Sequence, residues 1–198
     1  MKRTIRLLLI VFTVLSSVAL ATTRTAHADA SRCVLSTGTN LLQGNLDGSY
    51  YTIEVPSNWN GTLLLYNHGY VFADQPLANP AQDAPNAQDE TALLQEGYAL
   101  AGDSYSQNGW AVQQAFHDQI ALLDFFDATC GQPARTITWG GSMGGLITAG
   151  LVQLFPQRFA GAMPMCGILA GSVGIFNQDV DSIFAFNMLL ANGTLPTR

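Results

Sequence analysis

The strongest constraint on this chain is the stretch TITWGGSMGG at residues 136–145. An apolar, strand-like run enters it, and a helix-like apolar run begins at Leu146. A serine on a tight strand-to-helix turn has its hydroxyl pushed out of the sheet, and flanking glycines leave room for the strained backbone. Close helix packing is the alternative role for Gly144 and Gly145. The pattern makes Ser142 the candidate nucleophile.

The first thirty residues have the pattern of a secretory signal peptide. Lys2, Arg3 and Arg6 precede an apolar run at residues 7–21, and Ala28-Asp29-Ala30 supplies a small-x-small cleavage site. The alternative is a membrane anchor, but the run is short for a span of about 20 residues. We therefore expect cleavage after residue 30 and a mature protein secreted to the extracellular space or periplasm.

Composition predicts one globular domain over residues 31–198, because 48% of the chain is apolar and only 11% is charged. Without the leader no lysine remains, and four arginines face thirteen carboxylates, a formal charge of −9. Such a balance opposes binding to nucleic acid or to anionic membrane surfaces. We expect a soluble mature protein with no membrane partner, and the sequence leaves its oligomeric state open.

Cysteine usage predicts one disulfide and one free thiol. Cys33, Cys130 and Cys166 would all lie in an oxidising compartment, and the sequence leaves open which two of them pair. The spacing of Cys130 and Cys166 and the lack of neighbouring histidines argue against a metal site. No phosphate loop or dinucleotide fingerprint is present, so no cofactor is expected.

Strand-like and helix-like segments alternate along the chain, which predicts an α/β fold with a parallel sheet covered on both faces. An irregular lead-in is expected over residues 31–45, and a long surface loop over 71–89. Strands are expected at residues 50–55, 62–66, 98–101, 136–139 and 159–165. Helices are expected at residues 90–96, 110–130, 146–155 and 176–190.

The segment between Gly109 and Gly131 has the clearest amphipathic pattern. Its apolar face is expected to comprise Val112, Phe116, Ile120 and Leu123. The polar residues of this segment lie away from that face: Gln113, Gln114, His117 and Asp124. His117 is therefore expected to be a solvated surface residue.

From residue 50 to residue 165, the order of strand, His-Gly loop, helix, strand, helix, G-x-S-x-G turn, helix and strand resembles the α/β-hydrolase fold. The Gly-Gly-Ser-x-Gly-Gly form of the turn is similar to that of prolyl-oligopeptidase-like peptidases and of many secreted bacterial esterases. The resemblance implies a three-layer α/β-hydrolase fold with a mostly parallel sheet. It also implies that the C-terminal strands are missing and that residues 167–198 begin a cap.

The same resemblance assigns an oxyanion hole. In the family, backbone N–H groups of the residue after the nucleophile and of a residue in the His-Gly loop bind the oxyanion, which here implies Met143 and either Gly69 or Tyr70. Each such donor is worth ~3 kcal/mol to a tetrahedral intermediate. His68 is expected to shape this loop through local hydrogen bonds, because as catalytic base it would stand in the wrong chain order.

A serine nucleophile needs a histidine base oriented by a carboxylate, and in this fold both follow the serine along the chain. No histidine follows Ser142, and His27 lies in the leader. Asp179 and Asp181 do follow it but are expected to be solvated residues of a cap helix. Either this is the N-terminal portion of a longer enzyme, or it is a complete, inactive relative that binds a ligand. We favour the first, because a sheet without its last strands would expose an apolar edge.

The resulting hypothesis is a secreted serine hydrolase that cleaves small-molecule carboxylic esters through an acyl-enzyme on Ser142. A serine peptidase of prolyl-oligopeptidase-like type is the alternative, since the same elbow and oxyanion hole serve peptide substrates. A non-catalytic binding module is the competing class. Phe176, Phe184 and Phe186 fit a hydrophobic or aromatic acyl group, although packing of a helix against the core is the favoured explanation.

Overall fold

The computed structural model describes residues 30–194. A short 3-10 turn, η1 (Ala30–Cys33), is followed by β1 (Thr39–Leu46), β2 (Ser49–Pro56), β3 (Thr62–Asn67), α1 (Ala87–Gln95), β4 (Ala99–Asp103) and α2 (Val112–Cys130). Then come β5 (Arg135–Gly141), α3 (Met143–Leu154), η2 (Pro156–Arg158), β6 (Gly161–Met165) and α4 (Gly171–Leu189). Residues 1–29 of the predicted signal peptide, His27 among them, and residues 195–198 lie outside the described residues.

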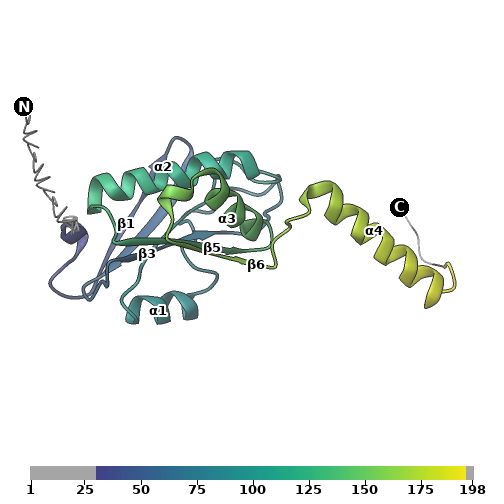
Figure 1. Cartoon of the computed structure of the whole chain (residues 1–198), viewed down its shortest axis with the longest axis horizontal. Helices are drawn as coiled ribbons and strands as arrows, with labels where there is room; N and C mark the ends of the chain where they lie inside the picture. The colour runs from purple at the N-terminus through teal and green to yellow at the C-terminus, as the bar shows by residue number, and fades with distance from the viewer. Residues whose placement is uncertain (1–29, 195–198) are drawn as a thin grey trace, which may run out of the picture.

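The strands form one sheet between two helical layers, which confirms the predicted α/β class. Helices α2 and α3 cover one face of the sheet and α1 covers the other (Figure 1). The strand order is β1-β2-β4-β3-β5-β6; the pairs β4-β3, β3-β5 and β5-β6 are parallel. Asn67, the last residue of β3, lies opposite Gly140 near the end of β5. The His-Gly loop and the Ser142 turn therefore leave the sheet at the same edge.

The predicted irregular lead-in over residues 31–45 is wrong for its second half, because residues 39–45 belong to β1. This strand pairs antiparallel with β2 through a two-residue turn at Asp47 and Gly48, whose φ angles are 48° and 100°. Asp-Gly is a strong hairpin signal, since both turn positions need positive φ. The strand was missed because it lies at the sheet edge, with Leu41 exposed and Leu42 only half-buried.

The other elements occur where predicted, with shifted starts. Helix α1 begins three residues early, within the predicted loop, because the Asn86 side chain accepts hydrogen bonds from the amides of Gln88 and Asp89. Helix α4 begins at Gly171, five residues before the predicted start at residue 176. These differences leave the order of strands and helices unchanged.

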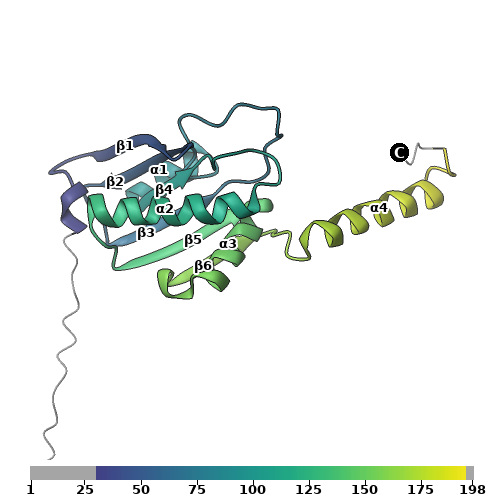
Figure 2. The ribbon, with the colours of Figure 1, turned by 90° about the horizontal axis from the view of Figure 1, so that it is seen from above.

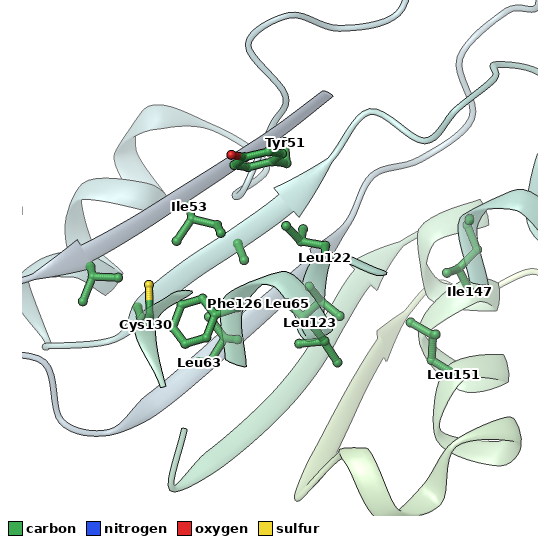
Figure 3. Close-up of a cluster of buried hydrophobic side chains, with 14 of the residues drawn as sticks. Tyr51, Ile53, Leu63, Leu65, Leu122, Leu123, Phe126, Cys130, Ile147 and Leu151 are labelled. Carbon is green, nitrogen blue, oxygen red and sulfur yellow. The ribbon is translucent and has the colours of Figure 1, made fainter. Parts of the chain in front are cut away.

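The buried face of α2 is displaced from the prediction, although Leu123 is buried as expected. Val112, Phe116 and Ile120 are only half-buried, whereas the neighbouring row is fully buried: Ala115, Gln119, Leu122, Phe126 and Cys130. Gln119 belongs to this row because its Nε2 donates to the Tyr66 carbonyl at 2.9 Å. Figure 3 shows the aliphatic and aromatic members of the row facing side chains of β2 and β3.

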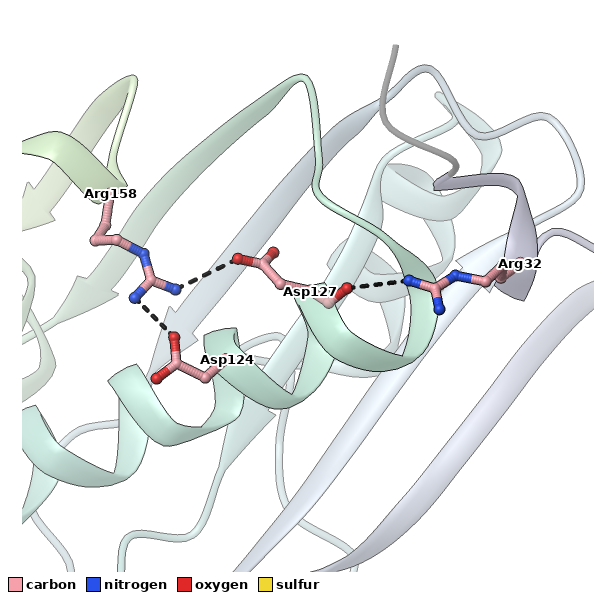
Figure 4. A network of polar contacts seen from close by, with 4 residues as sticks. All are labelled: Arg32, Asp124, Asp127 and Arg158. Atoms are coloured by element: carbon pink, nitrogen blue, oxygen red, sulfur yellow. Dashed lines mark hydrogen bonds and ion pairs between the residues drawn. The ribbon is translucent and has the colours of Figure 1, made fainter. Parts of the chain in front are cut away.

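A disulfide and a charged network fasten the C-terminal end of α2. Cys33 and Cys130 are bonded, and Cys166 is free and exposed, as the count of one bridge and one thiol predicted. Arg158 contacts Asp124 at 2.7 Å and Asp127 at 3.5 Å, and Arg32 donates to the Asp127 carbonyl (Figure 4). These contacts join η1, which precedes β1, and η2, which follows α3, to helix α2.

Helix α4 extends away from the sheet (Figures 1 and 2). Phe176 is 59% exposed, and Phe184 and Phe186 are exposed as well. The favoured explanation of these rings, packing against the core, is therefore wrong for the structure described.

None of the helices within residues 30–194 has the length and apolarity needed to cross a membrane. Over the same residues, no three metal-ligating side chains are gathered in a cluster that could hold an ion.

Candidate active site

Ser142 occupies the turn between β5 and α3. Its φ and ψ are 58° and −123°, a conformation that costs a non-glycine residue about 1–3 kcal/mol. The Ser142 amide donates to the Met165 carbonyl of β6 at 3.0 Å, and the residue is exposed at the edge of the sheet. The predicted strand, strained serine and helix are thus present in the expected order.

The glycines after Ser142 permit close backbone contacts. A Cβ atom on Gly144 would collide with the Asn67 carbonyl oxygen and lie 2.8 Å from that of His68. On Gly145 it would lie 2.7 Å from the Met165 carbonyl oxygen. These glycines therefore serve close packing, and that packing places the start of α3 directly against the His-Gly loop.

Asn67 joins the three elements that form the site, a role that the sequence analysis missed. Its buried side-chain amide donates to Thr138 Oγ1 and Thr148 Oγ1, both at 2.8 Å, and to the Trp139 carbonyl at 3.1 Å. These bonds fasten the end of β3 to β5 and α3. The signal in the sequence was a polar residue immediately after a continuous apolar strand.

The His-Gly loop lies beside the nucleophile. A Cβ atom built on Gly69 would be 3.9 Å from Ser142 Cβ and 3.7 Å from the Gly141 carbonyl oxygen. On the other side of Ser142, the Met143 amide precedes the first intrahelical hydrogen bond of α3, from Leu146 N–H to the Ser142 carbonyl. The structure thus brings the candidate oxyanion residues Met143, Gly69 and the following Tyr70 to the serine.

His68 is buried within the loop, and no hydrogen bond joins its ring nitrogens to Ser142. Its Nδ1 lies 2.7 Å from the Gly69 carbonyl, and its ring stacks on Tyr105 at 3.9 Å between centroids. The Tyr105 hydroxyl donates to the His68 carbonyl at 3.1 Å. Burial lowers the pKa of His68, so at neutral pH the ring is uncharged and Nδ1 donates to Gly69. This arrangement fits the expected loop-shaping role.

Within residues 30–194, no hydrogen bond links Ser142 to a histidine or a carboxylate. His117 is exposed on α2, as expected. Asp103, at the end of β4, is fully buried, and burial together with the Asp118 charge raises its pKa well above the ordinary value.

A groove of about 550 Å³ lies beside Tyr70, between the loops of the sheet edge and the start of α4. Its lining comprises Tyr70, Phe72, Trp110, Ile168, Ile175, Phe176 and Asp179. Asp179 is exposed, as predicted for a cap residue, but it also lines this groove, and Asp181 does not.

Comparisons with known proteins agree with this architecture. The prolyl oligopeptidase family matches residues 96–172, which include the Ser142 turn. The chain is 30% identical to an o-phthalyl amidase of Xanthobacter agilis over 147 residues, which are 73% of this chain and 30% of the amidase. This chain thus spans less than a third of that relative.

One solved structure shows the same fold. A putative dipeptidyl aminopeptidase IV of Bacteroides ovatus superposes with a TM-score of 0.51 at 14% identity, covering 63% of this chain and 21% of that one. A carboxyl esterase of Bacillus coagulans gives a TM-score of 0.45 at 12% identity, over 64% of this chain and 43% of the esterase.

Proposed function

Because the chain belongs to the α/β-hydrolase superfamily, we propose that it supplies the nucleophile and oxyanion hole of a serine hydrolase acting on carboxylic esters. One observation carries the proposal: an exposed serine in a strained turn has the free amide end of a helix on one side and the Gly69 backbone on the other. A residue held in such a conformation needs the surrounding structure to maintain it, which is typical of active sites.

In the proposed reaction, a base outside the described residues takes the Ser142 hydroxyl proton while Oγ attacks the ester carbonyl carbon. The tetrahedral oxyanion accepts a hydrogen bond from the Met143 amide and a second from Gly69 or Tyr70. The positive end of the α3 dipole adds to this stabilisation. Collapse of the intermediate expels the alcohol, which receives the proton, and leaves an acyl-enzyme that water then hydrolyses.

Secretion is part of the proposal. Its support is the leader-like pattern of residues 1–30 together with the Cys33–Cys130 disulfide, since such bonds persist in oxidising compartments.

Amide or peptide hydrolysis is the second candidate. Its support is the name of the relative, an o-phthalyl amidase, and the match to the prolyl oligopeptidase family. The same serine and oxyanion donors would serve, and only the leaving group would differ.

Labelling of the full-length protein with a fluorophosphonate tests the proposal. We expect one adduct per chain, lost in Ser142→Ala and retained in Ser57→Ala, which alters another exposed serine, on the turn after β2. Folded full-length protein that takes no label would overturn the enzymatic proposal and leave a binding module.

Matched substrates with one acyl group and either an alcohol or an amine leaving group then decide between the two candidates. Turnover of the amide alone would favour the second.

A further inference from the structure

The groove beside Tyr70 combines aromatic walls with a single carboxylate. We infer that it binds an aromatic or bulky apolar group that carries a positive charge, as one part of the substrate. The inference rests on the proposed function only for the assignment of the ligand as a substrate; binding itself requires no chemistry at Ser142.

The groove has the size and surface of a small-molecule site. Its volume of about 550 Å³ lies within the range of roughly 300–1,000 Å³ typical of such sites. Tyr70 and Phe72 pack edge to face with centroids 5.6 Å apart, and Trp110 adds a third ring. Faces of aromatic rings attract cations, and an indole attracts them most strongly.

Charge defines the class of ligand. Of the described residues that line the groove, Asp179 alone is charged. Both ion pairs recorded within residues 30–194 involve Arg158, so no cationic side chain neutralises Asp179 there. A carboxylate beside apolar rings attracts a cation and repels an anion. Net charge adds to this preference, because the chain carries −6 overall.

Both walls of the groove are anchored to the nucleophile turn. Tyr70 directly follows Gly69, which lies against Ser142. On the other wall, Ile168 directly follows Gly167, whose Cα would be 2.8 Å from a Cβ atom on Gly145. A ligand in the groove therefore lies at the same sheet edge as the proposed oxyanion hole, where it can orient an ester for attack.

Equilibrium binding of small probes to the full-length protein tests this inference. The probes are benzyltrimethylammonium, neutral benzyl alcohol and anionic benzenesulfonate, measured by calorimetry. We expect benzyltrimethylammonium to bind at least about fivefold more tightly than benzyl alcohol, and benzenesulfonate more weakly than either. Asp179→Asn should reduce the preference for the cation to the part that the aromatic rings supply.

Asp181→Asn is the matched control, because Asp181 is exposed on the same helix but does not line the groove. It should keep the preference, while Trp110→Leu should weaken binding of both the cation and the alcohol. Equal binding of the three probes, or equal effects of the two aspartate substitutions, would overturn the inference. None of the probes is an ester, so this failure is distinguishable from failure of fluorophosphonate labelling.

Discussion

The sheet with its covering helices is rich in apolar residues, and so is helix α4. The two regions differ in how far these apolar side chains are buried. Ile53, Leu63 and Phe126 are inaccessible to solvent in the first region, whereas Val180 and Leu189 are largely exposed in α4. Apolar side chains stabilise a fold only to the extent that water is removed from them. The sheet region thus draws its stability from its own contacts, whereas the apolar side chains of α4 contribute little burial among the described residues.

Truncating one phenylalanine in each region gives the largest expected contrast. Phe126 is 0% exposed and packs edge to face on Trp59, so Phe126→Ala should lower the free energy of unfolding by about 3–5 kcal/mol. Phe176→Ala should change it by no more than about 0.5 kcal/mol, because the ring is exposed. Thermal unfolding of the two variants measures the difference. Equal losses would show that α4 is packed after all.

A buried carboxyl group in the sheet region is the second difference between the two regions. Asp83 is 3% exposed in the loop before α1, and burial, then the charges of Glu54 and Glu90, raise its pKa to about 7. A raised pKa means that the folded state holds a proton that the unfolded state has released. Protonated Asp83 therefore contributes stability to the folded state that is fully present below about pH 4. This stability is lost as the pH rises through about 7.

Asp83→Asn should remove this pH dependence and stabilise the protein at pH 8 by no more than about 4 kcal/mol. Melting temperatures at pH 5 and pH 8 measure the effect. Asp181→Asn, at an exposed carboxylate of α4, should leave the pH profile as it is in the unsubstituted protein. A profile unaffected by Asp83→Asn would contradict the assignment.

The smallest expected effect concerns the backbone packing of the sheet region. Gly144→Ala should cost about 1–3 kcal/mol and slow labelling of Ser142, because the new methyl group would collide with the Asn67 carbonyl and displace the turn. Gly161→Ala is the control, since its methyl group would meet only Ile137 Cγ1 at an ordinary 3.9 Å. Unchanged labelling in Gly144→Ala would show that the turn tolerates displacement.

The features that sequence patterns predicted are those with a local signal. The apolar run before Ser142 and the glycines around it specify strand, turn and helix within ten residues. Helix α2 was found but its buried face was misplaced, because Gln119 enters the core through a bond to a backbone carbonyl 53 residues away. Asn67 was missed for the same reason, since its partners lie on other elements.

Features set by distant contacts were beyond the sequence. Cys33 and Cys130 are separated by 97 residues, and nothing near either one specifies its partner. Apolar residues at helical spacing indicate that a surface exists but not what covers it, so Phe176 was assigned to the core and is exposed. The groove that Phe176 lines is formed by three separate segments, and only their folding together reveals it.

The Cys33–Cys130 bond also decides what a protease would release. Every peptide bond between these residues lies inside a covalent ring, so a single cut in the loop at residues 71–85 leaves both pieces attached. The product would migrate on a nonreducing gel as one species and separate into two only after reduction. The link at residues 166–170 lies outside the ring. One cut there would free α4 and leave the rest of the described chain, Ser142 included, in a single covalent piece.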